Sequence, residues 1–368
     1  MKKIAALVLV SLLCVSFLAS CVGTTVIVGE CNCNCNCNNQ NPNPTPTPGG
    51  NGGGGSLKTG LSVSTSVSGS FSATAEKDGE AAFDITIAAV LVDSQGVIVS
   101  CIVDSVPATV KFNTNGKITS DRNATVLTKD ELGDNYNMVA WGGAKAEWYE
   151  QIAAFEKYAE GKTVDQLKNG DIDMTTGKPK DGTDLSSSAS IYLAGYVYAV
   201  EAAVNNATDL GAKTGDTLVL STLNNVKSSA DYTAASGSTN AKNGVAELDS
   251  DIVVLTRNGD TITSCYIDAV QAKVEFDATG KITTDLEEKI KTKNELGSDY
   301  NMVAWGGAKF EWNEQAASFA KYVTGKTAAE VANIAVTEST KPQDGTDLAS
   351  SVTIAVGGFQ ALIAKAMQ

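Results

Sequence analysis

Each half of the chain opens with apolar, β-branched runs that flank short polar turns. FDITIAAVLV and VIVSCIVDSV flank a DSQG turn in the first half, and SDIVVLT and TITSCYIDAV flank RNGD in the second. Runs of this kind around short turns predict antiparallel hairpins. We expect a second hairpin in each half, where TVKFNTNGKITS turns at Asn115-Gly116 and KVEFDATGKITT turns at Thr279-Gly280.

The apolar spacing changes from that of a strand to that of a helix further along each half. Trp148, Ile152, Phe155 and Ala159 fall on one face of a helix, and Gly161 is well placed to end it. Small apolar residues after SSAS and SSVT predict that each half closes with a helix beginning at its hydroxyl cluster, where Ser186 or Ser350 would cap it. The predicted class is therefore α+β, with an antiparallel sheet followed by helices.

Short capping motifs mark one further helix in each half. Thr163 is followed three residues later by Gln166, and Thr327 by Glu330. A threonine with a glutamine or glutamate at this spacing is typical of a capping box, in which each side chain binds the other residue's backbone N–H. We expect a short helix to begin at each threonine.

The two halves are copies of one module. The segment from Glu131 to Thr163 recurs from Glu295 to Thr327 at a constant shift of 164 positions. The repeat contains all four tryptophans of the chain, Trp141, Trp148, Trp305 and Trp312. Repetition at a fixed period indicates a duplicated structural unit. We therefore expect two tandem copies of one α+β module.

The module boundaries follow from a second, shorter match. Lys-Thr-Gly occurs at Lys58 and again at Lys213, close to the expected start of each copy. This places module 1 at residues 57–208 and module 2 at 209–368.

The N-terminal segment has the features of an export signal. Residues 1–20 contain two lysines followed by an apolar stretch and small residues before Cys21. LASC resembles the lipobox of bacterial lipoproteins, and that resemblance implies lipidation of the Cys21 thiol. The lipid membrane would then be a partner, and the mature protein would be anchored to it outside the cytoplasm, at the cell surface.

Residues 21–56 predict a tether. They combine CNCNCNCN, a Pro-Thr stretch and a glycine run, none of which can bury a core. The tether carries four alternating cysteines, Cys31, Cys33, Cys35 and Cys37. These thiols are weak candidates for binding a soft metal, for cross-linking or for disulfides, or they belong to a low-complexity spacer. Cys101 and Cys265 instead lie in apolar strands and are expected to be buried.

Charge and histidine content narrow the possible functions. The formal net charge is −14, which argues against nucleic acid and against an anionic membrane surface as partners. The chain contains no histidine, so catalytic triads, His-based general bases and ordinary zinc sites with histidine ligands are excluded.

The repeated tryptophans fall into two classes. Trp148 and Trp312 belong to the apolar helix stripe and are expected in the core. Trp141 and Trp305 each precede Gly-Gly in a loop. They either pack in the core or close over a planar ligand such as a sugar or an isoalloxazine ring.

The order of motifs resembles the FMN-binding domain of the C subunit of the sodium-pumping NADH:quinone oxidoreductase, of the Rnf G subunit and of tandem flavinylated surface lipoproteins. GKITS and GKITT precede ELG in the place of the family's Glu-Thr-Pro-Gly loop, and a helix ending in Gly-Lys follows in each copy. The family's final Ser/Thr-Gly-Ala-Thr motif falls on SSAS and SSVT, with Ser188 and Ser351 in place of its glycine. The resemblance covers most of both modules.

The resemblance implies FMN as a cofactor, one per module, attached through a phosphoester to Ser190 and Thr353. It also implies a set of cofactor-binding residues: Ser187, Ser188, Ser350, Ser351, Glu131, Gly133, Glu295, Gly297, Trp141 and Trp305. A helix N-terminus beside clustered hydroxyls is suited to hold a phosphate.

Two hypotheses of different class follow. In the first, the protein is a surface-tethered flavoprotein that carries electrons from a membrane donor to an extracellular acceptor, and it is a carrier more than a complete enzyme. In the second, it is a non-catalytic surface lipoprotein that keeps the fold for binding or structure without cofactor. A third, narrower possibility is carbohydrate recognition through Trp141 and Trp305.

Overall fold

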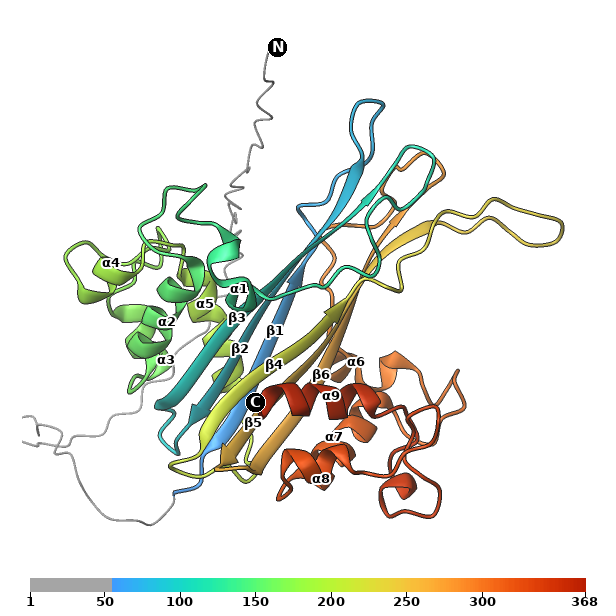
Figure 1. Ribbon diagram of the computed structural model, residues 1–368. Helices are drawn as coiled ribbons and strands as arrows, with labels where there is room; N and C mark the ends of the chain where they lie inside the picture. Colours follow the sequence, from blue (N-terminus) through green and yellow to red (C-terminus); the bar gives the residue numbers. More distant parts are fainter. Residues whose placement is uncertain (1–54) are drawn as a thin grey trace, which may run out of the picture. The chain divides into compact units, whose positions relative to one another are not determined.

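The computed structural model describes residues 55–368 (Figure 1). The predicted signal segment, the lipidation site Cys21, the cysteine run of the tether and most of the tether itself lie outside the described residues. Within residues 55–368 none of the helices combines the length and the apolar character that crossing a membrane requires.

Module 1 is a three-stranded antiparallel sheet followed by helices. Its elements are β1 (Lys58–Ser66), β2 (Gly79–Val92), β3 (Ile98–Phe112), α1 (Lys129–Leu132), the 3₁₀ turn η1 (Gly133–Tyr136), α2 (Trp148–Ala159), α3 (Val164–Asn169), α4 (Asp184–Ser188) and α5 (Ala194–Asn205). The strands are hydrogen-bonded in the order β1-β2-β3.

Module 2 repeats this order. Its elements are β4 (Thr217–Asn225), β5 (Gly244–Asn258), β6 (Thr261–Phe276), α6 (Lys293–Leu296), η2 (Gly297–Tyr300), α7 (Trp312–Val323), α8 (Ala328–Ala332), η3 (Leu348–Ser350) and α9 (Gly357–Ala366). The sheet order is β4-β5-β6. The prediction of two tandem α+β modules, each with an antiparallel sheet before its helices, is confirmed.

The strand pairs around the DSQG and RNGD turns form as expected. The second predicted hairpins do not continue into a further strand of the sheet. Asp93 holds the first turn, because its Oδ1 accepts the N–H groups of Gln95 and Val97 at 2.9 Å each. After the next turn the chain returns to β3 only through one bridge, Phe112 with Ile118, and module 2 repeats this. The chain then leaves its own sheet.

The inner faces of the two sheets pack against each other in one shared core. Ile85 and Ile87 of β2 belong to the same buried cluster as Ile252 and Val254 of β5. The rings of Phe112 and Phe276, the last residues of β3 and β6, stack within this cluster, with centroids 4.1 Å apart and planes inclined by 2°. Each strand must therefore be apolar on both faces, which explains the unbroken apolar runs of β2 and β5.

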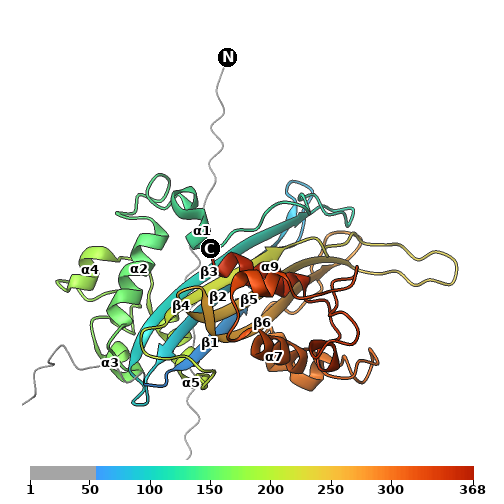
Figure 2. The same cartoon turned by 60° about the horizontal axis from the view of Figure 1, so that its bottom comes forward.

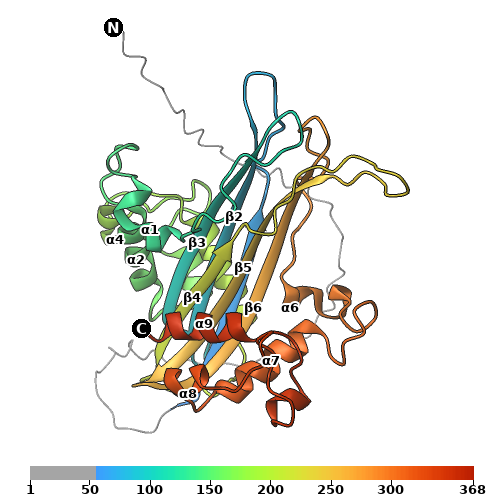
Figure 3. The same ribbon diagram turned by 45° about the vertical axis from the view of Figure 1, so that its right-hand side comes forward.

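The outer face of each sheet is covered by that module's own helices. Figures 1 and 2 show α2, α3 and α4 on one side of the strands and α7 on the other, and Figure 3 shows α8 and α9 on the side of α7. Trp148, Ile152, Phe155 and Ala159 are all buried against β3, so the predicted helix stripe is confirmed. The order of layers is helix, sheet, sheet, helix.

Each module also covers the free edge of the other module's sheet. Ile290, from the segment before α6, bridges Thr65 of β1, and Val126, from the segment before α1, bridges Asn224 of β4. The exchange is reciprocal, so the duplication behaves as an internal pseudo-dimer. Neither module contains all the contacts that its sheet uses.

The two Lys-Thr-Gly tripeptides do not occupy equivalent positions. In module 1, Cys101 of β3 is level, across β2, with Gly60 of β1, the glycine of the first tripeptide. In module 2, the equivalent Cys265 of β6 is level, across β5, with Val219 of β4, which is not in the second tripeptide. Lys213 precedes β4 and pairs with Ser56, at the start of module 1. The two tripeptides therefore do not mark equivalent strand positions, and the segment between the modules pairs with the start of module 1.

Candidate functional site

Ser190 and Thr353, the predicted attachment residues, are held in the same way in both modules. Ser190 N–H and Oγ–H donate to Gln151 Oε1 at 2.8 and 3.2 Å, and Ile191 N–H donates to the same oxygen at 3.2 Å. Thr353 makes the corresponding bonds to Gln315 at 2.7 and 3.1 Å. Both glutamines are buried, at 1% and 0% exposure, whereas Ser190 and Thr353 are exposed. Each hydroxyl is thus fixed in place on the surface.

The last helix of each module begins later than the sequence predicts. The hydroxyl cluster of module 1 forms a separate short helix, α4, capped by Thr183, whose Oγ1 accepts the N–H of Ser186 at 3.2 Å. The chain is then extended at Ala189, and α5 begins only at Ala194. The expectation that Ser186 or Ser350 caps the last helix is therefore wrong. At Ser190 and Ile191, where free helix N–H groups were expected, both backbone N–H groups donate to the side chain of Gln151 instead.

The other hydroxyls of the two clusters bond within their own short helices. Ser187 Oγ donates to the Asp184 carbonyl at 2.6 Å, and Ser350 Oγ donates to the Asp347 carbonyl at 2.7 Å. Ser351 Oγ lies 3.4 Å from the Leu348 carbonyl. Ser188 lies beside Ser187, with 3.4 Å between their hydroxyl oxygens. Among these residues only Ser190 and Thr353 are held from another helix.

Glu131 and Glu295 close capping boxes at α1 and α6. Each carboxylate accepts the N–H of the capping residue, Thr128 or Thr292, at 3.0 Å. Their outward oxygens differ in partner, because Glu131 pairs with Lys365 of module 2 and Glu295 pairs with Lys289 of its own module. The two glutamates thus have the same structural role, as capping residues, but form ion pairs with lysines at non-equivalent positions.

Gly133 and Gly297 end α1 and α6 in a conformation that favours glycine. Their φ angles are 50° and 51°, in the left-handed half of the backbone map. They allow the chain to turn at once into η1 and η2. The backbone conformation alone explains why glycine occurs at this position in both modules.

Trp141 and Trp305 project from the surface, at 81% and 89% exposure. The turn that carries Trp141 is rigidly held, because the buried carboxylate of Glu147 accepts the N–H groups of Met138 and Val139 at 2.8 and 3.0 Å. Glu311 holds the turn of Trp305 in the same way. Of the two alternatives for these tryptophans, core packing is excluded.

Trp148 and Trp312 are buried, as predicted. A lysine ammonium lies over each indole ring: Lys129 Nζ is 5.6 Å from the Trp148 ring centroid, and Lys293 Nζ is 5.0 Å from that of Trp312. Cations at such distances from aromatic faces are attracted to them.

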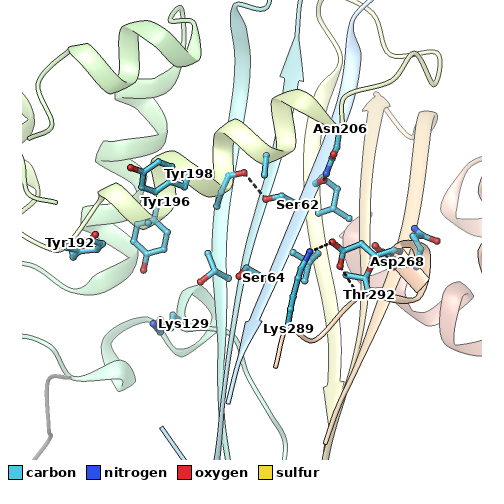
Figure 4. Close-up of a pocket in the computed structure, with 18 of the residues that line it drawn as sticks. Ser62, Ser64, Lys129, Tyr192, Tyr196, Tyr198, Asn206, Asp268, Lys289 and Thr292 are labelled. Carbon is cyan, nitrogen blue, oxygen red and sulfur yellow. Dashed lines mark hydrogen bonds and ion pairs between the residues drawn. The ribbon is translucent and has the colours of Figure 1, made fainter. Parts of the chain in front are cut away.

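An open cleft of about 910 Å³ lies between the modules, next to Ser190. Ile191 and Tyr192, which directly follow Ser190, line it. Figure 4 shows Tyr192, just before α5, and Tyr196 and Tyr198 of α5 on one side and residues of module 2 on the other, with β1 between them. Ile191 and Tyr192 thus line the same cleft as Glu295 of the other module.

Two aspartates, the half-buried Asp104 and the buried Asp268, anchor the first helix of each module to its sheet. Asp104 Oδ1 accepts the N–H of Ser105 at 2.7 Å and of Asp130 at 3.2 Å. Burial raises the pKa of Asp104 to about 6, against these hydrogen bonds, which lower it, and the pKa of Asp268 is likewise raised to about 6. Both modules keep this arrangement, which indicates a structural role.

Another half-buried acid, Glu156, has no acidic counterpart in module 2. Glu156 Oε1 accepts the Val103 N–H at 2.7 Å, and burial raises the pKa of Glu156 to about 7. Ala320 occupies the equivalent place in module 2. The Cys101 thiol is buried beside Glu156, and burial raises its pKa, as burial raises that of Cys265 to about 12. Both cysteines are buried, as expected.

Comparisons with known proteins returned nothing: no family model, no curated protein and no solved structure matches the chain. Within residues 55–368 no group of three or more histidine, cysteine, aspartate or glutamate side chains is arranged to hold a metal ion. The cysteine run of the tether lies outside these residues.

Sequence reasoning missed the residues that hold the site. Gln151, Gln315, Glu147 and Glu311 are polar residues at or beside buried positions of the repeated helix, and each bonds a loop. A polar residue retained on the inner stripe of an amphipathic helix, in both copies, is the signal that would have found them.

Proposed function

We propose that the protein carries electrons at the cell surface between a membrane donor and an extracellular acceptor, through FMN bound at its modules. The observation that supports this best is the equal pose of Ser190 and Thr353. Each presents an exposed hydroxyl that donates its proton to a buried glutamine. A hydroxyl so placed is accessible to a modifying enzyme.

The residues around these hydroxyls are compatible with a phosphate group. Lys309 Nζ lies 3.3 Å from the Ser350 carbonyl, close to Thr353 along the chain, and Lys145 occupies the equivalent sequence position in module 1. A lysine ammonium would offset the charge of a phosphodiester. Bound FMN would supply the electron-transfer chemistry, while the chain would fix its phosphate and orient it at the surface.

The test is covalent flavin in the denatured protein. The full chain is produced in a host that carries a flavin transferase, separated in a denaturing gel and viewed under ultraviolet light. We expect fluorescence that disappears in the Ser190→Ala, Thr353→Ala double variant. The matched control, Ser187→Ala with Ser350→Ala, removes neighbouring hydroxyls and should stay fluorescent. A dark wild-type band would overturn covalent attachment, and a colourless native protein as well would overturn the flavoprotein proposal.

The exposed tryptophans favour a second candidate, a non-catalytic surface protein that binds through Trp141 and Trp305. A rigid turn that holds a nearly bare indole offers a flat apolar face at little entropic cost, which suits stacking on a sugar ring. Gel electrophoresis through soluble polysaccharides tests it. Retardation of the wild type that is lost in Trp141→Ala, Trp305→Ala, but kept in Val99→Ala, would support it. Equal mobility in every polysaccharide would refute it.

A further inference from the structure

The cleft between the modules is open where α5 of module 1 faces module 2. Ala202, on α5, is half-buried and lines the cleft. Glu295 lies among the residues across from it and pairs with Lys289, with 2.8 Å between Nζ and Oε1. The small side chain of Ala202 does not reach Glu295, so the space between the two modules remains free.

The equivalent place in module 2 is spanned by a lysine. Lys365 of α9 lies as far along the chain from Thr353 as Ala202 lies from Ser190. Its ammonium donates to the Thr222 carbonyl of β4 at 2.7 Å and pairs with Glu131, the counterpart of Glu295. The Lys365 side chain therefore extends from α9 across to the other module. Two differences between the copies distinguish the two places: alanine stands for lysine at Ala202, and Tyr192 stands where module 2 has Ala355.

The walls of the open cleft differ in chemistry. Tyr192, Tyr196 and Tyr198 form an aromatic wall in module 1. The facing wall, in module 2, is polar and charged: it is formed by Asp268, Lys289 and Thr292, which Figure 4 shows, and by Asn294 and Glu295. Aromatic side chains favour a flat ring by stacking, and hydroxyl, amide and charged groups favour a hydrogen-bonding chain. A ligand with a planar polycyclic ring and a polyhydroxyl side chain satisfies both walls.

We infer that this cleft is a binding site, shared by both modules, for a planar polycyclic aromatic ligand with a polar side chain, the class to which flavins belong. Ala202 keeps it open, and Lys365 closes its counterpart. The choice of flavin rests on the proposed function. Within residues 55–368 we accordingly expect one ring-binding cleft, and Ser190 directly precedes two of its lining residues, Ile191 and Tyr192.

The test uses free riboflavin, which has no phosphate and cannot be attached through one. The full chain is produced without a flavin transferase and titrated, and flavin fluorescence is followed because nearby tyrosine and tryptophan rings quench it. We expect one riboflavin per chain. Ala202→Lys, which supplies the bridge found in module 2, should weaken binding by about tenfold or more. Lys365→Ala should raise the stoichiometry above one.

Controls separate a blocked cleft from a misfolded one. Ala202→Lys is compared with wild type by circular dichroism and thermal melting. Tyr192→Ala, an exposed position, provides a second variant that should weaken binding about threefold to tenfold through lost stacking. Absence of quenching in wild type at about 0.1 mM riboflavin, or unchanged binding in folded Ala202→Lys, would overturn the inference. A stoichiometry that stays at one in Lys365→Ala would overturn the role of Lys365.

The two proposals fail in different ways. A dark gel band together with stoichiometric riboflavin binding would remove covalent attachment and leave the cleft. A fluorescent band together with no binding of free riboflavin would leave attachment and remove the cleft.

Discussion

Module 1 and module 2 have the same elements in the same order but differ where they face each other. At this boundary module 1 has Ala202 and Tyr192 where module 2 has Lys365 and Ala355. Away from the boundary, on the helix that packs against β3, module 1 has Glu156 where module 2 has Ala320. The two modules keep the same strands and long helices despite these substitutions. The comparison teaches that duplication preserved the packing residues, while the residues at the boundary between copies diverged and decided which space stayed open.

The largest effect is expected at the shared core. Phe112→Ala removes a fully buried ring stacked on Phe276 and should lower the free energy of unfolding by about 3–5 kcal/mol. Because the core belongs to both sheets, both modules should lose stability together. Urea unfolding followed by fluorescence of Trp148 and Trp312, each observed after replacing the other tryptophans by phenylalanine, should give coincident transitions. Separate transitions would mean that the modules fold independently.

The next effect concerns the glutamines that both modules keep. Gln151→Ala leaves the N–H groups of Ser190 and Ile191 without their acceptor and should cost about 1–3 kcal/mol, and Gln315→Ala should cost a similar amount. Hydrogen exchange should then accelerate at those two amides more than at amides of α3. If only one of the two variants lost stability, the same hydrogen bonds would contribute unequally to the stability of the two modules.

A pH dependence should distinguish the modules. The pKa of Glu156 is about 7 in the folded protein against an ordinary 4.5, so its contribution to stability is complete below 4.5 and is lost as pH rises through 7. Glu156→Gln should therefore raise stability at pH 8 by about 1–3 kcal/mol and change little at pH 4.

The matched control for that pH dependence is Ala320→Glu, which should give module 2 the same dependence. Asp104 and Asp268 keep a shared dependence between 3.8 and about 6 in every variant. Urea unfolding between pH 4 and pH 8 measures the pH dependence due to the glutamate and the one due to the two aspartates. Equal pH profiles for Glu156→Gln and wild type would contradict the assignment.

The smallest effect is expected at the exposed tryptophans. Trp141→Ala and Trp305→Ala should each change stability by less than about 0.5 kcal/mol, because neither indole is buried. Trp148→Ala, at 3% exposure, should cost about 3–5 kcal/mol. Thermal melts of the three variants compare them directly. A large loss at Trp141 would indicate that its turn supports the fold, not a surface contact.

Much of the local structure was predictable, because it depends on short-range physics. Strands, the first turns, the Trp148 stripe and the Thr163 and Thr327 capping boxes each follow from residues a few positions apart. The start of the last helix was not predictable from local preference. Gln151, far from Ser190 in sequence, satisfies the N–H groups that a helix end would otherwise expose.

By itself the sequence determined the duplication, the α+β class of each copy and the burial of Trp148, Trp312 and the two strand cysteines. Only the tertiary structure decided that the copies share one core and that each covers the other's sheet edge. It also decided that Ala202 faces a cleft while Lys365 reaches Glu131. The reason is physical: periodicity reports which side of an element is apolar, but the partner that covers that side is chosen by packing between segments far apart in the chain.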